Sequence, residues 1–234
     1  MTQKAGESGR GRSHAVHRAL KRAILDQALS PGAKLPEDSI GERLGVSRTL
    51  VREALVRLSE EGLVDLRPNK GATVARPTLE EGRNLFLTRM ALERLVVETL
   101  SGRLTKEQIE TLSAHIAAED AAKPEHALSI RLAGEFHTLL AQMTNNASLI
   151  RYVNETVARS SLILALYGRP HSSDCAVSEH REILDHLIAG KSDEAVKLMA
   201  HHLDSITTRA LLPKEDDRNL KDVLSAYAVA EGLA

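Results

Sequence analysis

The chain has 234 residues, longer than the usual single domain, and its 42% hydrophobic content is enough for a core in each of two domains. Residues 1–76 contain 14 Lys and Arg against 9 Asp and Glu, whereas the remainder contains 17 against 23, so only the first part, at about +5, has the charge expected for binding nucleic acid. The first dozen residues contain no targeting segment, the longest apolar run (162–167) is too short to cross a bilayer, and the single cysteine excludes an internal disulfide. We therefore expect a cytoplasmic protein with no membrane partner.

The chain begins with a segment, residues 1–13, that is rich in Gly, Ser and basic side chains and is predicted to be a disordered arm. An amphipathic helix is expected over residues 14–28, followed by a turn-forming stretch over 30–36. Together with the elements up to residue 76, this helix predicts a first domain over 14–76.

The pattern of residues 40–76 is that of a winged helix-turn-helix: a short helix, a glycine turn, a second helix and a tight strand pair. Gly45 allows the sharp turn between the helices, and Ser47 is expected to cap the second helix. At the helical period, that helix has one apolar side for packing, formed by Val51, Ala54, Leu55 and Leu58.

The opposite side of the second helix is polar and carries Arg48, Thr49 and Arg52. Arginine can donate two hydrogen bonds to guanine, and threonine can contact a thymine methyl group or a phosphate. This side is therefore predicted to read bases in a major groove. The alternative is that these arginines are merely solvated.

A β-hairpin is predicted from the two apolar runs 63–66 and 72–74, which flank a basic tip over 67–71. Lys70 is expected to reach a phosphate or the minor groove, with Gly71 beside it. The predicted DNA-binding residues are therefore Ser47, Arg48, Thr49, Arg52, Lys70 and Gly71.

The second domain is predicted to be an all-helical bundle over 77–212, so the fold class is mainly α: an N-terminal winged helix-turn-helix with a small β-hairpin wing and a C-terminal helical bundle. Its helical patterns cover residues 78–101, 105–122, 126–143, 147–167, 174–189 and 192–212. Residues 213–234 form a C-terminal tail to which we assign no role.

Three histidines of this bundle, His137, His180 and His202, lie on the apolar stripes of three different helices and are expected to face inward. For a single inward histidine, a hydrogen-bonded core residue is the better interpretation. Three neutral imidazoles together are suited to Zn²⁺ or Ni²⁺, with an open position for the carboxylate of an effector. They are therefore predicted to bind both metal and effector.

The winged segment resembles the N-terminal domain of the GntR family of bacterial transcription regulators over roughly residues 14–76. The motifs that carry this resemblance are Pro31-Gly32, Leu35-Pro36-Glu37, Leu44-Gly45-Val46-Ser47-Arg48-Thr49, Val51-Arg52-Glu53-Ala54-Leu55 and Glu61-Gly62-Leu63. One departure is Asp38, where many members carry an arginine that contacts DNA. The resemblance therefore implies DNA binding with one anchoring contact changed.

The bundle resembles the FCD ligand-binding domain of the FadR subfamily over roughly residues 78–212. The motifs are Arg89-Met90-Ala91-Leu92-Glu93, Glu135-Phe136-His137, Glu179-His180-Arg181 and His202-Leu203. This resemblance implies a homodimer, a palindromic double-stranded DNA operator and a small organic acid or similar metabolite as effector. Metal-binding FCD domains usually have an aspartate at the position of Ala133, so one metal ligand of the family is missing here.

Arg89 has two possible partners in the bundle. It can pair with the carboxylate of an effector, or with Glu93, four residues further along the same helix. We include it among the predicted effector-binding residues, together with the three histidines.

The function predicted from both halves is an effector-responsive transcription regulator, a repressor, rather than an enzyme. The alternatives are a metalloenzyme that uses the three histidines, a metal-sensing regulator, or a DNA-architectural protein. The enzyme leaves the winged segment unexplained, and the sequence offers no positioned carboxylate base, nucleophile elbow or phosphate loop.

Overall fold

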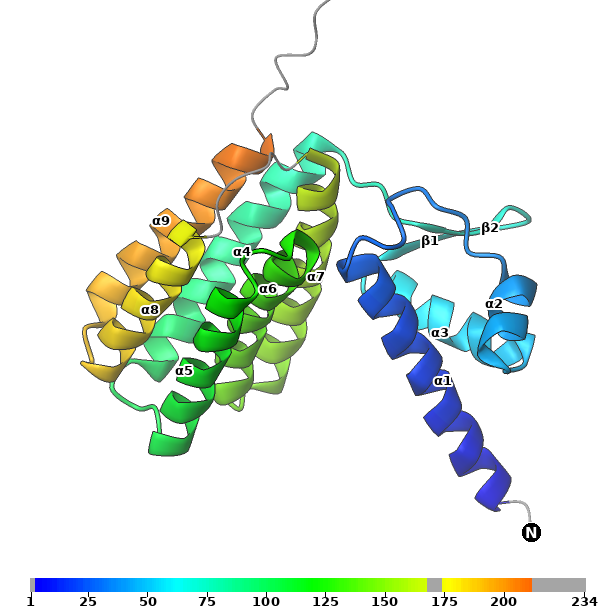
Figure 1. Ribbon diagram of the computed structural model, residues 1–234, viewed down its shortest axis with the longest axis horizontal. Coiled ribbons are helices and arrows are strands. Elements are labelled where there is room, and N and C mark those ends of the chain that lie inside the picture. The colour runs from blue at the N-terminus through cyan, green and yellow to red at the C-terminus, as the bar shows by residue number, and fades with distance from the viewer. Residues whose placement is uncertain (1–2, 168–173, 212–234) are drawn as a thin grey trace, which may run out of the picture.

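The computed structural model describes residues 3–167 and 174–211, and Figure 1 shows them as two domains joined by a short linker. The winged domain, residues 3–76, contains α1 (Gln3–Leu25), α2 (Glu37–Leu44), α3 (Arg48–Glu60), β1 (Val64–Arg67) and β2 (Gly71–Val74). The helical domain, residues 77–167 and 174–211, contains α4 (Leu79–Leu100), α5 (Lys106–Ala121), α6 (His126–Met143), α7 (Ala147–Tyr167), α8 (Asp174–Ile188) and α9 (Ser192–Leu211). The predicted mainly α fold class is confirmed, and the tail over 213–234 lies outside the described residues.

The core of the winged domain is formed by the predicted packing stripe of α3. Val51, Ala54, Leu55 and Leu58 are fully buried, against Val16, Leu20 and Ile24 of α1. Gly45 ends α2 in the left-handed region, with a φ of 63°, so glycine removes the steric cost of the turn into α3. The inter-helix turn therefore forms where the sequence predicted it.

The wing is an antiparallel pair in which Val64 lies opposite Val74 and Arg67 opposite Gly71. Asn69 and Gly71 have φ angles of 60° and 81°, which let the chain reverse direction within three residues. Valines at the base are buried, whereas the tip is exposed. Lys70 and Gly71 therefore lie at the solvent-exposed end of the hairpin.

The predicted disordered arm over residues 1–13 differs from the structure, in which α1 is already helical from Gln3 and ends at Leu25, before residue 28. Its Arg12 side chain donates a hydrogen bond to the main-chain oxygen of Gly45, and Ser13 is fully buried. These tertiary contacts tie the early turns of α1 to the turn after α2. Composition alone did not reveal them because they join positions far apart in the sequence.

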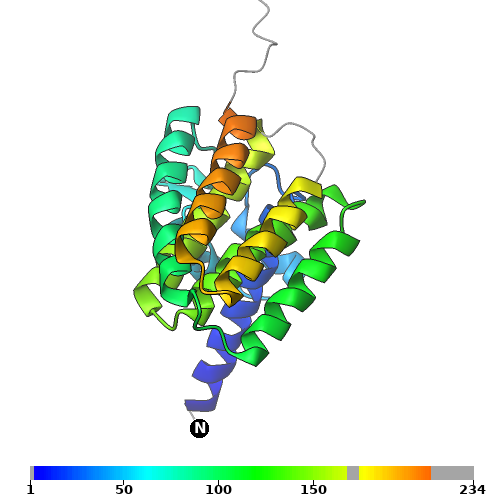
Figure 2. The same ribbon diagram turned by 90° about the vertical axis from the view of Figure 1, so that its left-hand side faces the viewer.

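The helical domain forms a bundle around one apolar core, to which its six described helices contribute (Figure 2). Helix α4 packs against α7 and α9, α5 packs against α6 and α8, and α6 packs against α7. Helices α4 and α5 begin with capping boxes, Thr78 with Glu81 and Thr105 with Gln108, which satisfy amide groups of their first turns. No helix in the described ranges is long and apolar enough to cross a membrane.

Contacts between the two domains involve α6 and α7. Leu162 of α7 is buried in the core of the winged domain, and a Cβ added at Gly62 would lie 2.7 Å from Cδ of Arg159. At the end of α1, Oδ1 of Asp26 lies 2.8 Å from Nε of Arg131 on α6. This second contact is an ion pair rather than a hydrogen bond, because neither atom has a partner in hydrogen-bond geometry.

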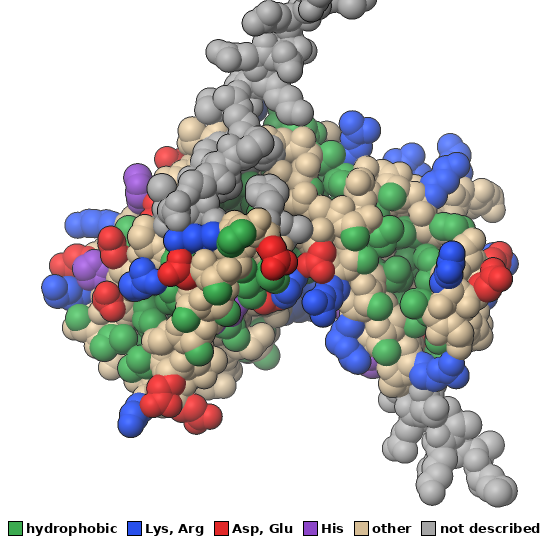
Figure 3. All heavy atoms as spheres, in the orientation of Figure 1, with side chains coloured by type: hydrophobic (Ala, Val, Ile, Leu, Met, Phe, Trp, Pro, Cys, Tyr) green, Lys and Arg blue, Asp and Glu red, His purple; other side chains and the backbone are tan. Residues whose placement is uncertain are grey.

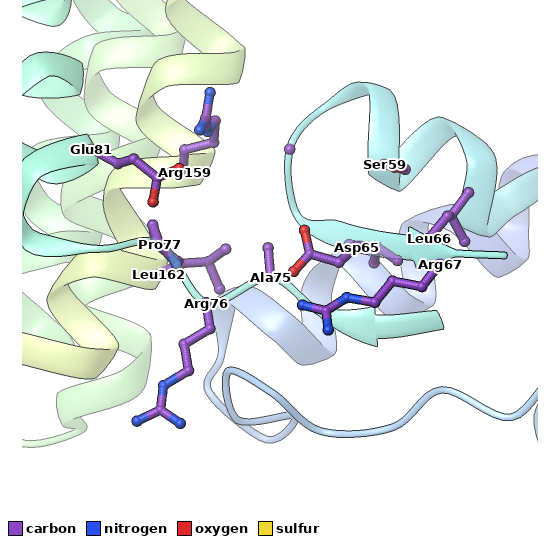
Figure 4. Close-up of a pocket in the computed structure, with 12 residues that line it drawn as sticks. Ser59, Asp65, Leu66, Arg67, Ala75, Arg76, Pro77, Glu81, Arg159 and Leu162 are labelled. Atoms are coloured by element: carbon purple, nitrogen blue, oxygen red, sulfur yellow. The ribbon is translucent and has the colours of Figure 1, made fainter. Parts of the chain in front are cut away.

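A cleft of about 410 Å³ lies at the domain junction, and Figure 4 shows its two sides. Asp65 and Arg67 of the wing border one side, and Glu81 and Arg159 of the helical domain border the other. The linker over residues 75–77 passes between them. The domains therefore contact each other through α7 but are separated next to the wing.

Candidate DNA-reading face and histidine centre

The polar side of α3 is exposed in the structure. Arg48, Thr49 and Arg52 face solvent, opposite the buried stripe that packs on α1. On the face shown in Figure 3, Lys and Arg side chains lie along several edges of the winged domain. The structure thus presents the three residues predicted to contact bases on one accessible side of one helix.

Ser47 is the N-cap residue of α3, but its hydroxyl makes no capping hydrogen bond, so the predicted side-chain cap is wrong. The amides of Leu50 and Val51 instead donate to the main-chain oxygen of Ser47, at 3.1 and 3.2 Å. Because these amides are satisfied by the backbone, the helix begins here without the hydroxyl.

The two arginines predicted to contact bases share one carboxylate, that of Glu37 at the start of α2. Nε of Arg48 lies 2.7 Å from Oε2 of Glu37, and Arg52 donates through Nε at 3.0 Å and Nη2 at 2.9 Å. The hydrogen bonds from Arg52 and then Arg48 lower the pKa of Glu37. Asp38, the residue that departs from the family pattern, lies 3.5 Å from Nη1 of Arg48. Glu37 was not assigned a role from the sequence, whereas Asp38 was expected to change one anchoring contact to DNA.

The three histidines come together inside the helical domain. His137 of α6, His180 of α8 and His202 of α9 are each at most 2% exposed, and one nitrogen from each lies within 4.8 Å of the other two. The predicted inward orientation is therefore observed. Phe136 stacks on the ring of His180, with centroids 4.0 Å apart, and fixes one wall of the centre.

A carboxylate holds the Nδ1 side of each imidazole. Nδ1 of His180 is 2.8 Å from Glu119, Nδ1 of His202 is 2.6 Å from Glu179, and Nδ1 of His137 contacts Glu93. A neutral imidazole that donates its Nδ1 proton to a carboxylate leaves the lone pair of Nε2 available to a metal. An ionised carboxylate at Nδ1 therefore favours, for each ring, the tautomer whose Nε2 can bind a metal.

The three Nε2 atoms point toward one another. Nε2 of His202 lies 3.1 Å from that of His180 and 3.3 Å from that of His137. In a tetrahedral site with Zn–N bonds of about 2.0–2.1 Å, neighbouring ligand nitrogens are about 3.3 Å apart. The donor set therefore fits a divalent metal ion bound by three histidines, with one position left open.

Burial sets the charge of this centre. It lowers the pKa of His137 and His180 well below the usual value for histidine, so both rings stay neutral near pH 7. Burial also raises the pKa of Glu119 to about 7. Glu93 differs: burial acts to raise its pKa, but Arg89 and His137 outweigh burial and lower it to about 2. A cation placed between the three Nε2 atoms would be bound by their lone pairs.

Arg89 pairs with Glu93, the second of the two partners considered from the sequence. Its Nε lies 2.5 Å from Oε1 of Glu93, and both side chains are buried. Nη2 of Arg89 is also buried and has no hydrogen-bond partner. One donor of this guanidinium is therefore unsatisfied beside the carboxylate that holds His137.

Sequence reasoning did not assign a role to Glu119, nor to Glu93 or Glu179 as partners of the histidines. A signal for Glu119 was present, because it follows Leu112 and Ile116 at helical spacing on a stripe that is otherwise apolar. An acidic side chain on a buried stripe requires a partner. Glu135, which is two residues before His137, instead binds Arg131 on its own helix at 2.6 Å.

A winged helix-turn-helix in one domain and a buried cluster of three histidines in a helical second domain are features of a two-domain, DNA-binding transcription regulator. Residues 12–74 match the bacterial regulatory proteins of the gntR family, and residues 84–205 match the FCD domain. The chain belongs to the GntR family and carries an FCD domain as its effector-binding part. These are families of transcription regulators, so the protein is a regulator and not an enzyme.

Named relatives agree with this assignment. The chain is 27% identical over 197 residues to the HTH-type transcriptional repressor RspR of Escherichia coli K12, covering 82% of this chain and 86% of the relative. It is 28% identical over 222 residues to the HTH-type transcriptional repressor NanR of Enterobacter sp. 638, covering 83% of this chain and 84% of the relative.

Solved structures share the fold. A GntR transcriptional regulator from Rhodococcus sp. RHA1 superposes with a TM-score of 0.76 at 24% identity, covering 88% of this chain and all of that one. Escherichia coli McbR/YncC superposes with a TM-score of 0.72 at 21% identity, covering 92% of this chain and 98% of that one.

Proposed function

We propose that the protein is a repressor that binds a palindromic operator as a homodimer, and that a small organic acid, bound in the helical domain at a divalent metal ion, alters its DNA affinity. The observation that supports the sensing part of the proposal is the convergence of the three Nε2 atoms, at 3.1 and 3.3 Å. RspR and NanR are both named as repressors, which supports the direction of regulation. The same proposal includes a cytoplasmic location and membership of the FadR subfamily. It also places the domain limits at residues 14–76 and 77–212.

In this proposal the winged domain reads DNA through α3 and the wing. Arg48, Thr49 and Arg52 contact base edges, with Ser47 at the start of the helix. Lys70 and Gly71 contact the backbone or the minor groove. The exposure of all six residues supports this assignment.

The sensing site consists of His137, His180 and His202 as metal ligands. A bound Zn²⁺ or Ni²⁺ would supply an open coordination position for an effector carboxylate. Glu93, Glu119 and Glu179 would fix the rings, and the unsatisfied Nη2 of Arg89 would donate a hydrogen bond to the effector. Ala133 leaves the position of the usual aspartate without an oxygen ligand.

Helix α6 connects this site to the winged domain. It carries His137 and, six residues earlier, Arg131, which pairs with Asp26 at the end of α1. A ligand that prefers one position of α6 would therefore bias the position of the winged domain. The cleft beside the wing leaves room for such a shift.

The test is operator binding with and without ligand. The protein should select a palindromic sequence from a pool of random duplexes. Its affinity for that duplex should then change at least fivefold when candidate organic acids are added in the presence of Zn²⁺ or Ni²⁺, which corresponds to a coupling free energy of about 1 kcal/mol. The matched control is His137→Ala, which should bind the duplex but lose the response. If the variant responds like the wild type, the effector site lies elsewhere.

A metal-sensing regulator is the second candidate, because the centre is so completely buried. Metal alone distinguishes the two. A change in operator affinity with metal and no acid supports the sensor, whereas a change that requires both supports the organic effector.

The outer face of α4 and α7 is the proposed dimer interface. Leu87 and Leu95 of α4 are 64% and 48% exposed, and Tyr152 of α7 is 50% exposed beside an apolar groove between the helices. Large apolar side chains that are exposed on neighbouring helices are typical of a protein contact.

Leu95→Glu should convert the dimer to a monomer, because a charge would then be buried without a partner. Sedimentation velocity of the full chain at micromolar concentration measures this directly. Ile188→Glu is the matched control, since Ile188 is 45% exposed at the end of α8, and it should remain dimeric. A dimeric Leu95→Glu variant would place the interface on another surface.

A further inference from the structure

We propose that Glu37 is a specificity-determining positioning residue: it fixes the two recognition arginines for base reading and suppresses their attraction to DNA of any sequence. This inference rests on the proposed role of Arg48 and Arg52 in contacting bases. It adds Glu37 of α2, which lies outside the recognition helix, to the residues that determine base specificity.

The pairing between Glu37 and Arg52 uses one edge of the guanidinium and leaves the other. Glu37 accepts from Nε and Nη2, the side edge, at 3.0 and 2.9 Å. A guanidinium has five N–H donors in a rigid fork, so the end edge formed by Nη1 and Nη2 can still donate two parallel hydrogen bonds. That is the arrangement required for O6 and N7 of guanine.

Exposure supports the same assignment. The side chain of Glu37 is 19% exposed, whereas those of Arg48 and Arg52 are 59% and 60% exposed. The carboxylate is therefore covered by the arginines that it holds, and the arginines remain accessible to a partner. Since long side chains lose conformational freedom on binding, arginines that are already fixed bind at a smaller entropic cost.

The charges of Glu37 and Asp38 account for the second proposed effect, the weaker attraction to DNA of any sequence. Glu37 and Asp38 formally cancel Arg48 and Arg52, so this part of the winged domain is neutral despite its two arginines. Binding to DNA of arbitrary sequence depends on the number of phosphates that basic groups neutralise. Cancelling the charge weakens that binding, whereas hydrogen bonds to the correct bases remain available.

A purely structural role for Glu37 is the competing interpretation. Anionic residues are favourable in the first turn of a helix, and the ion pairs also join α2 to α3. Such a role would affect the folded fraction of the protein. It would not change the ratio of affinities for two DNA sequences, because the folded fraction affects both affinities equally.

The experiment compares Glu37→Gln with Glu42→Gln, an equal change of charge at an exposed position of the same helix. The probes are a duplex that the wild-type protein selects from a random pool and a shuffled duplex of the same composition. Dissociation constants for both are measured by fluorescence anisotropy at one salt concentration. Glu37→Gln should bind the shuffled duplex more tightly and lower the ratio of the two affinities by about tenfold, near the lower end of what one bidentate guanine contact contributes. Glu42→Gln should leave the ratio within about twofold of wild type.

Arg52→Lys tests whether Glu37 acts through the side edge of the Arg52 guanidinium, because lysine keeps the charge but has no such edge. It should lower the ratio in its own right. Glu37→Gln should then lower the ratio by less than it does in the wild-type background, because only the pairing with Arg48 and the charge of Glu37 remain to be lost. The proposal is overturned if Glu37→Gln behaves like Glu42→Gln, or if its effect is equally large in the Arg52→Lys background. If the wild-type protein selects no sequence from the pool, the proposed function itself fails before any variant is compared.

Discussion

Protein purified without chelator and without a nickel-affinity step should contain about one divalent metal ion per chain, and His180→Ala should contain almost none. The reason is that three Nε2 atoms converge at 3.1 and 3.3 Å, the spacing of ligands around one metal ion, and removing one imidazole leaves only two ligands. Elemental analysis of the dialysed protein measures the occupancy. This is the largest change that we expect from any single substitution in the helical domain.

His201→Ala is the matched control, because His201 lies next to His202 on α9 but is exposed. Its metal content should equal that of the wild type. Glu119→Gln should give an intermediate result, with affinity lowered about 10- to 100-fold, as is usual when the partner of a metal-bound histidine is changed. Equal metal contents in His180→Ala and His201→Ala would show that the histidines are ordinary core residues.

The same centre predicts how stability depends on pH once metal has been removed by chelation. Because burial lowers the pKa of His137 and His180 in the folded chain, the unfolded chain binds more protons below about pH 6.5, and stability should fall there by about 1.4 kcal/mol per pH unit for each ring. Glu119 acts in the opposite direction: its pKa is raised to about 7, so its contribution is lost as the pH rises toward 7. Between about pH 5 and 6.5 the two rings outweigh the one carboxyl group. Urea unfolding should therefore show that the free energy of unfolding increases with pH over this range. The increase should be steeper in Glu119→Gln, which lacks the opposing carboxyl group.

Arg52→Ala should weaken binding to the selected operator by about 1–3 kcal/mol, roughly 5- to 150-fold, while changing binding to shuffled DNA much less. The expectation follows from the exposed side of α3, where Arg52 retains an unused donor edge beside Glu37. Anisotropy titrations at several salt concentrations measure both the affinity and its salt dependence.

Two other substitutions separate base reading from general attraction. Lys70→Ala, at the exposed tip of the wing, should weaken binding to all duplexes alike. It should also reduce by about one the slope of the logarithm of the binding constant against the logarithm of the salt concentration. Lys106→Ala, at the start of α5, changes the net charge equally and should leave DNA binding unaltered, because this side chain is 91% exposed and lies outside the proposed interfaces. If Arg52→Ala binds the operator as tightly as Lys106→Ala does, α3 does not present this face to the bases.

Local sequence signals determined much of the fold. The helical period of α3 was sufficient to separate Val51, Ala54, Leu55 and Leu58 from the polar side, because burial of one stripe fixes the orientation of the opposite one. Gly45 and the turn residues of the wing marked chain reversals through their own backbone preferences. The inward orientation of the three histidines followed from the same periodicity.

Contacts between distant residues required the tertiary structure. Glu37 meets Arg52 across the inter-helix turn, and Glu119 meets His180 across 61 residues. Periodicity indicates which face of a helix is buried, but it does not indicate which helix lies opposite that face. For the same reason the first turns of α1 were expected to be disordered, although Arg12 and Ser13 contact the rest of the domain. The sequence by itself therefore determined the elements, their faces and the class of protein, whereas packing alone decided the partners that set the charge, the tautomers and the geometry of both sites.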